Sequence, residues 1–265
     1  MKRLILPVMV IAGLAAPVTS RAIDFLNDNF DSYANQAAFE ALWPVVGALP
    51  SGTLSTAQSD TAPNSIFNAG TTLAASAMRN QRSFAETGVP SPINPISFSF
   101  SFYDGNAAAS PYRSHSNLQD GTGPTSYGQL VAMGLNNNQL SSANGGNFYM
   151  ARILGYTPTD TGGTSGSFFK LNDVGAPLRS TGWHNLQVEI TDLSFRFFVD
   201  GILSKTVAQT GTLRSYDHVR LGSGLSNAGN DSYFDNVLVQ VPEPTAAALA
   251  GIGICMLIGL RRSRR

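Results

Sequence analysis

The fold is decided by the stretch Ile96-Ser97-Phe98-Ser99-Phe100-Ser101-Phe102, in which apolar and polar residues alternate without a break. Successive side chains of a β-strand point to opposite faces, so this alternation predicts a strand with one buried face. Its phenylalanines would form one wall of a hydrophobic core.

Few segments of the chain have the apolar periodicity of a helix. The pattern of the segment after Asn35 is the exception. It favours one short helix over Gln36–Leu42, which begins after Asn35 and packs through Phe39 and Trp43. Further strands are predicted over Tyr127–Leu135, Phe148–Leu154, Ser167–Leu171, Trp183–Ile190, Phe195–Asp200, Ile202–Val207, Val219–Gly222 and Tyr233–Val241. Segments 52–72 and 104–126 are rich in turn-forming residues and are predicted as long surface loops.

The dipeptide Asp200-Gly201 between two of these strands predicts a tight hairpin, because both residues tolerate the positive φ angles of a type I′ turn. Many antiparallel strands with almost no helix predict an all-β fold: a sandwich, a jelly roll or a barrel.

Three motifs narrow this choice: Gly182-Trp183-His184-Asn185-Leu186, the Asp200-Gly201 hairpin and Tyr233-Phe234-Asp235-Asn236-Val237. Over residues 183–239 they resemble the concanavalin A-like (laminin-G-like) domains. The resemblance implies an antiparallel β-sandwich of the jelly-roll kind, in which the last strand lies near the first.

The two ends of the chain have targeting patterns. Lys2 and Arg3 precede an apolar stretch, and Ser20-Arg21-Ala22 offers small residues for cleavage, so residues 1–22 are predicted to be a signal peptide with a helical apolar part. At the other end, Val241-Pro242-Glu243-Pro244 forms an extended hinge, since proline disfavours both a continuing strand and a helix.

An uncharged apolar run over residues 246–260 follows the hinge and predicts a transmembrane helix. At about 1.5 Å per residue it is about 22 Å long, short of the roughly 30 Å hydrocarbon core. The basic tail, 261–265, contains Arg261, Arg262, Arg264 and Arg265, which the positive-inside rule places on the cytoplasmic side.

Hinge, short helix and arginines together resemble the PEP-CTERM sorting signal of Gram-negative bacteria. The resemblance implies that exosortase processes the chain and that the protein is linked to exopolysaccharide and biofilm. The alternative is an ordinary tail anchor. With the signal peptide it implies passage through the secretion translocon, cleavage by signal peptidase, and anchoring in the inner membrane until residues 23–240 reach the cell surface.

The exported part is acidic, with 10 lysines and arginines against 16 aspartates and glutamates over residues 23–240. This sign disfavours nucleic acid and anionic membranes as partners. The single cysteine, Cys255, lies in the tail, so no disulfide is expected in the exported domain.

Asp28, Asp31 and Asp235 would be neighbours if the first and last strands pair, and carboxylates at such a junction suit a structural calcium ion. The alternative is that these aspartates are exposed or accept from turn backbone.

No catalytic residue is predicted, and we expect a protein that is not an enzyme. Glu189 and Asp192 lack the spacing and the second glutamate of a glucanase-type carboxylate pair, and His115, His184 and His218 lie too far apart for a local zinc motif. His184 is expected on a strand surface.

Tyr103, Asp104 and Tyr112 are candidate sugar-binding residues, since sugar faces stack on rings while hydroxyl groups need polar partners. The alternative is that these tyrosines cover the sandwich edge. The sequence thus favours an exported surface or matrix protein with a structural or adhesive role. A lectin-like carbohydrate-binding module is the second interpretation, and a glycosidase the third.

Overall fold

The computed structural model describes residues 22–47, 49–70, 78–105, 113–121, 128–136, 147–155, 168–222 and 231–242. Residues 1–21 of the predicted signal peptide, the predicted helix over 246–260 and the four tail arginines lie outside these residues. In the described part, no helix has the length and apolar character needed to cross a membrane.

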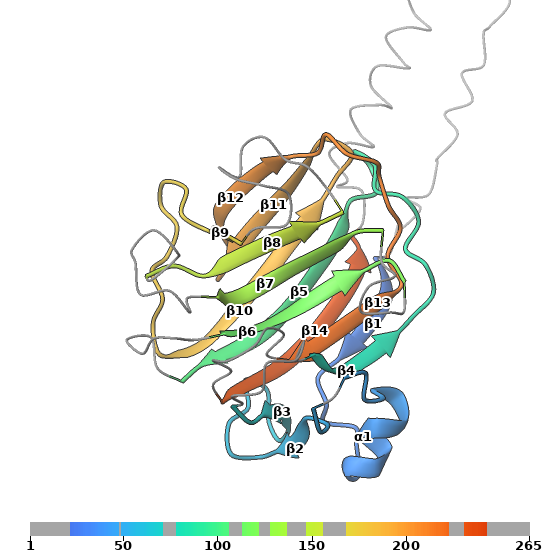
Figure 1. The fold of residues 1–265 in the computed structure, drawn as a ribbon, viewed down its shortest axis with the longest axis vertical. Helices are drawn as coiled ribbons and strands as arrows, with labels where there is room; N and C mark the ends of the chain where they lie inside the picture. The colour runs from blue at the N-terminus through green and yellow to red at the C-terminus, as the bar shows by residue number, and fades with distance from the viewer. Residues whose placement is uncertain are drawn as a thin grey trace, which may run out of the picture.

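The described strands form two antiparallel sheets that pack face to face (Figure 1). Sheet A has eight strands in the order β12 (Ile202–Ala208), β11 (Ser194–Val199), β10 (Gly182–Ile190), β5 (Ile96–Asp104), β14 (Ser232–Val241), β3 (Ser65–Asn68) and β2 (Thr53–Ser55), with β1 (Ile23–Asp28) also pairing with β14. Sheet B has six strands in the order β4 (Met78–Ser83), β13 (His218–Gly222), β6 (Arg113–Gln119), β7 (Leu130–Asn136), β8 (Met150–Leu154) and β9 (Phe169–Lys170). This β-sandwich is the all-β fold that the alternation predicted.

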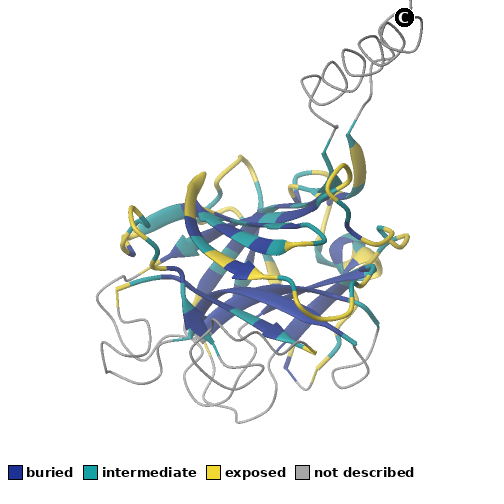
Figure 2. Cartoon of the chain, turned by 90° about the horizontal axis from the view of Figure 1, so that it is seen from above, coloured by how far each residue is buried: buried dark blue, intermediate teal, exposed yellow. Residues whose placement is uncertain are grey.

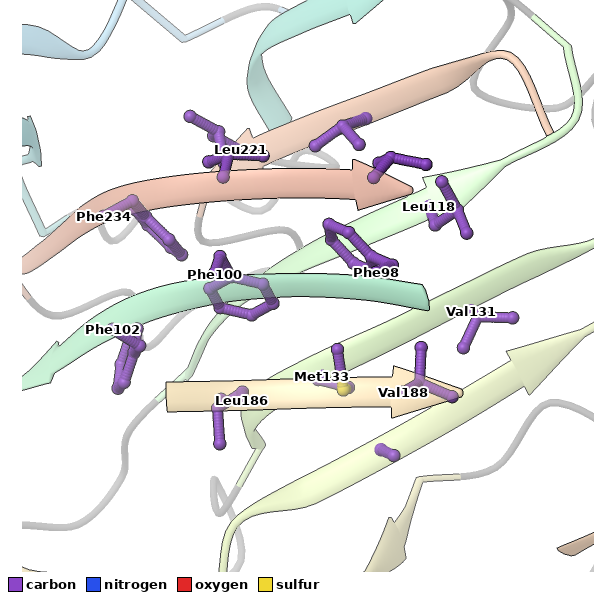
Figure 3. Close-up of a cluster of buried hydrophobic side chains, with 14 of the residues drawn as sticks. Phe98, Phe100, Phe102, Leu118, Val131, Met133, Leu186, Val188, Leu221 and Phe234 are labelled. Atoms are coloured by element: carbon purple, nitrogen blue, oxygen red, sulfur yellow. The ribbon is translucent and has the colours of Figure 1, made fainter. Parts of the chain in front are cut away.

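The core lies between the two sheets, and Figure 2 shows that many residues of the packed strands are buried. Phe98, Phe100 and Phe102 of β5 are fully buried and face Val131 and Met133 of β7 across the sandwich (Figure 3). The wall predicted from the Ile96–Phe102 alternation is therefore confirmed.

The predicted pairing of the first and last strands is also confirmed. β14 is long enough to pair with β3 through Ser232–Phe234 and with β1 through Val237–Val241. Between these parts a bulge at Asn236, where φ is 49°, lets both Phe234 and Val237 point into the core.

Two further sequence predictions agree with the structure. α1 spans Gln36–Leu42, and the Asn35 side chain accepts from the Ala38 N–H at its start. Asp200 and Gly201 join β11 to β12 with φ angles of 52° and 76°.

The prediction that segments 52–72 and 104–126 are long loops was wrong in part. Segment 52–72 contains β2 and β3, and segment 104–126 contains β6 in the middle of sheet B. β6 lacks apolar alternation because its inward Ser114 and Ser116 donate hydrogen bonds to Ser232 Oγ and the Arg220 carbonyl instead of packing apolar groups.

Candidate functional site

Four aromatic side chains form a continuous row across the outer face of sheet A. Trp183 of β10 pairs with Tyr103 of β5, Tyr103 with Tyr233 of β14, and Tyr233 with Phe67 of β3. Their ring centroids are 5.4, 5.8 and 4.9 Å apart in that order. We call these four residues the aromatic row.

The register explains why the row faces solvent. Its neighbours Phe102 and Phe234 point into the core, so the alternation of each strand turns Tyr103 and Tyr233 outward. All four rings are half-buried, which leaves part of each ring accessible. The strands concerned are adjacent in Figure 1, although Phe67 and Tyr233 are far apart in the sequence.

Polar side chains lie beside the aromatic row on the same face, two residues along the strands from Trp183 and Tyr103. Asn185 follows Trp183 on the same face and is exposed, opposite Ser101 of β5. Ser101 donates to the Asp60 carboxylate, which also accepts from the Asn236 amide at 3.1 Å. Rings beside amides and hydroxyl groups are the combination that sugars require.

Of the three predicted sugar-binding residues, only Tyr103 belongs to this row. Asp104 points to the opposite side and is fully buried, where Arg179 Nε and Nη2 donate to its two oxygens at 2.9 and 3.1 Å. Burial, with a contribution from Asp104, raises the pKa of the neighbouring Tyr149 hydroxyl. Asp104 therefore stabilises the end of the sandwich, and Tyr112 lies outside the described residues.

His184 is not the surface residue that the sequence suggested, because its side chain is only 9% exposed. Its Nδ1 is 2.8 Å from Asp200 Oδ2, and its Nε2 is 3.1 Å from Ser180 Oγ. Nε2 is also 2.9 Å from the Ser180 carbonyl oxygen, which can only accept. In a catalytic Ser-His-Asp triad Nε2 must accept the serine proton, so this arrangement holds the β11–β12 turn rather than activating Ser180.

The three aspartates of the predicted calcium site accept hydrogen bonds from the protein. Asp28 Oδ2 accepts from the Tyr33 hydroxyl at 2.5 Å and from the Trp43 indole at 2.9 Å. Asp31 accepts from the Asn64 N–H and the Asn29 amide. Both carboxylates thus already have hydrogen-bond donors within the protein.

Asp235, the third of them, is fully buried and accepts from the backbone N–H groups of Asp60, Thr61 and Asn236. Burial raises its pKa to about 6, although these three donors act in the opposite direction. Within the described ranges no three Asp, Glu, His or Cys side chains are placed to hold a metal ion. The geometry thus gives the calcium site no support, and calcium binding stays a prediction.

A pocket of about 510 Å³ lies at one end of sheet B, and its lining includes Glu86, Asp120, Arg214 and Asp217. Asp120 accepts from the Gln129 N–H, and Asp217 accepts from the Gly121 N–H and contacts His218 Nδ1. Both aspartates thus have structural partners, and the expectation that the protein is not an enzyme stays a prediction.

The sorting motif lies at the edge of the described residues. Val241 ends β14 and Pro242 follows it, while Glu243 and Pro244 lie outside.

No family model matches the chain, and no curated protein matches it in sequence. Solved structures do share its fold. A carbohydrate esterase from the Shiga toxin-encoding bacteriophage phi24B is 11% identical with a TM-score of 0.51, over 84% of this chain and 100% of that one. Domain 4 of AbnA, an extracellular GH43 arabinanase from Geobacillus stearothermophilus in complex with arabinotriose, is 10% identical with a TM-score of 0.50, over 85% and 95% of the two chains.

A sialidase is 9% identical with a TM-score of 0.48, and this chain spans 18% of its length. At these identities the likeness to the esterase and to the arabinanase domain establishes the fold alone, a β-sandwich.

Proposed function

We propose that the protein is an exported carbohydrate-binding surface protein whose sugar site is the aromatic row. The observation that carries the proposal is the continuity of four half-buried rings across four neighbouring strands. All four rings point outward near one end of strands β10, β5, β14 and β3, where a chain of sugars could lie across them. The shared fold with carbohydrate-binding domains supports the same conclusion.

The proposal includes the delivery of the protein. The resemblance of residues 241–265 to the PEP-CTERM signal supports sorting by exosortase, and the predicted signal peptide supports export. We propose that the exported domain has a structural or adhesive role in an exopolysaccharide matrix, which a sugar-binding surface would serve.

The test is retention of the full-length chain on insoluble neutral polysaccharides, namely cellulose, chitin and mannan. We expect retention on at least one of them, and we expect Trp183→Ala to weaken it by about tenfold, which corresponds to about 1.4 kcal/mol of binding free energy. The loss follows from removing the largest ring of the row.

Phe198→Ala is the matched control. Phe198 is a half-buried ring on the same outer face of sheet A, but it lies on β11 under the Arg196 guanidinium and outside the row. The proposal requires Phe198→Ala to bind as the unmodified chain does. Absence of retention on all three polysaccharides, or equal losses in both variants, would show that the row is only a set of packing contacts.

A further inference from the structure

Exposed carboxylates lie on both sides of the aromatic row. Asp231 directly precedes β14, and Asp60 belongs to the segment between β2 and β3. Both side chains are exposed, so a ligand on the row can reach them. The charge of these two groups adds a second criterion to the rings for the kind of sugar that the row binds.

Asp231 lies on the side of the row where β14 begins. Its Oδ1 accepts from the Gly70 N–H at 2.7 Å, which places the carboxylate beside the end of β3. Burial raises the pKa of the Tyr233 hydroxyl, and the charge of Asp231 adds to the rise. An electrostatic field that disfavours a phenolate at Tyr233 favours a cation at the same place.

Asp60 lies on the opposite side of the row. Its Oδ2 accepts from Ser101 Oγ at 2.5 Å and from the Asn236 amide at 3.1 Å. Ser101 is two residues from Tyr103 on the same face of β5, so these bonds hold the carboxylate next to the row. A carboxylate offers about four acceptor sites, and the described residues fill two of those of Asp60.

The basic residues of sheet A do not cancel these charges. Arg196 of β11 and Lys205 of β12 lie beyond β10, and each forms an ion pair with a carboxylate at 2.9 Å. Arg79 of β4 approaches the end of β3, where it donates to the Ala69 carbonyl, but it is only 3% exposed. Since residues 23–240 are also acidic as a whole, the row attracts cations and repels anions.

A sugar that bears a protonated amino group uses both features of this surface. Its ring stacks on the aromatic side chains as any pyranose does, and its ammonium group is attracted to the faces of tyrosine and tryptophan rings. The carboxylates at the sides of the row accept charge-assisted hydrogen bonds from the same ammonium group. A neutral sugar gains only the stacking, and an acidic sugar is repelled.

We infer that the aromatic row prefers a polysaccharide whose sugars bear free amino groups, of the class of N-deacetylated glucosamine polymers. The rings bind the sugar faces, and Asp60 and Asp231 bind the ammonium groups. The inference rests on the proposed function, because it assigns the ligand class of the same site.

The test is affinity electrophoresis of the full-length chain through gels that contain glycol chitosan or the fully N-acetylated form of the same preparation. A mildly acidic buffer keeps the amino groups protonated. Acetylation removes the positive charge and keeps the sugar chain, so the pair isolates the effect of the amino group. We expect the amino form to bind at least tenfold more tightly, and we expect added salt to reduce the difference because it screens exposed charges.

The double variant Asp60→Asn/Asp231→Asn should lose this preference. It should still bind the acetylated polymer as the unmodified chain does, which also shows that the variant is folded. Asp24→Asn/Glu86→Gln is the matched control, since it removes two exposed negative charges away from the row. Asp24 pairs with Gln240 at the other end of β14, and Glu86 lines the pocket at the end of sheet B.

The control variant should keep the preference, and Trp183→Ala should weaken binding to both polymers. Equal losses in the two double variants would assign the preference to the net charge of the domain and overturn the inference. Unweakened binding of the amino form by Trp183→Ala would place that binding outside the row. Equal affinity for the two polymers would overturn the inference and leave the proposed function intact. Binding to neither polymer would also overturn it, and the proposed function would fall only if cellulose, chitin and mannan failed as well.

Discussion

Asp235 shows how a single buried side chain makes stability depend on pH. Its carboxyl lies beneath the segment that contains Asp60 and Thr61, whose N–H groups donate to it. Burial nevertheless dominates and raises its pKa from 3.8 to about 6. Between these two values the folded chain holds a proton that the unfolded chain has released.

We therefore expect Asp235 to contribute stability that is fully present below about pH 4 and is lost as the pH rises through 6. The contribution amounts to about 3 kcal/mol, the free-energy equivalent of that rise in pKa. Urea unfolding of the unmodified chain and of Asp235→Asn at pH 4, 5, 6 and 7 measures it. The stability difference between the two proteins should shift by this amount against the unmodified chain as the pH rises, and a constant difference would contradict the prediction.

At the scale of an element, the stability of the β11–β12 hairpin depends on the backbone conformation of one residue. Gly201 has a φ of 76°, and no atom beyond its neighbours lies within 4 Å of the position that a Cβ would take. A substitution there is thus strained through the backbone alone. We expect Gly201→Ala to lower the free energy of unfolding by about 1 kcal/mol, and Gly201→Asn to cost less because asparagine adopts positive φ more readily. Equal costs for the two variants in thermal or urea unfolding would be evidence against a turn set by φ.

Elements with a local signal were predictable from the sequence. β5 has strict alternation, α1 has its Asn35 cap, and the hairpin has Asp200-Gly201. β6 has no such signal, because both of its faces are buried and polar: Ser114 and Ser116 bond within the core, while His115 and Asn117 belong to the other face. Hydrophobic periodicity cannot identify a strand of that kind.

The candidate site was predictable only in part, for a related reason. The sequence indicates Tyr103 as a candidate sugar-binding residue, and it indicates Trp183 only by its place in a strand motif. Their alignment with Tyr233 and Phe67 depends on the order β10-β5-β14-β3, in which neighbouring strands are distant in sequence. The acidic side of the row likewise requires that Asp60 reach β5 from the segment between β2 and β3. Contacts between distant segments set the site, and no spacing within one segment reports them.

At the scale of the whole molecule, the proposed sugar site exists only in the folded chain. Its four rings come from β3, β5, β10 and β14, which are spread over residues 65–241. Unfolding separates these strands and with them the rings, so a polysaccharide that lies across the row binds the folded state alone. Binding therefore stabilises the sandwich as a whole rather than one hairpin.

We accordingly expect the N-acetylated polymer to protect the full-length chain against urea. At a free concentration of about 100 times Kd, the free energy of unfolding should rise by about 2.7 kcal/mol. The neutral polymer is the better probe, because the unfolded chain keeps its negative charge and would also attract free amino groups. Phe198→Ala should gain the same protection, whereas Trp183→Ala should gain about half as much at the same concentration because its affinity is about tenfold lower. Equal protection of Trp183→Ala and the unmodified chain would contradict a site that spans the four strands.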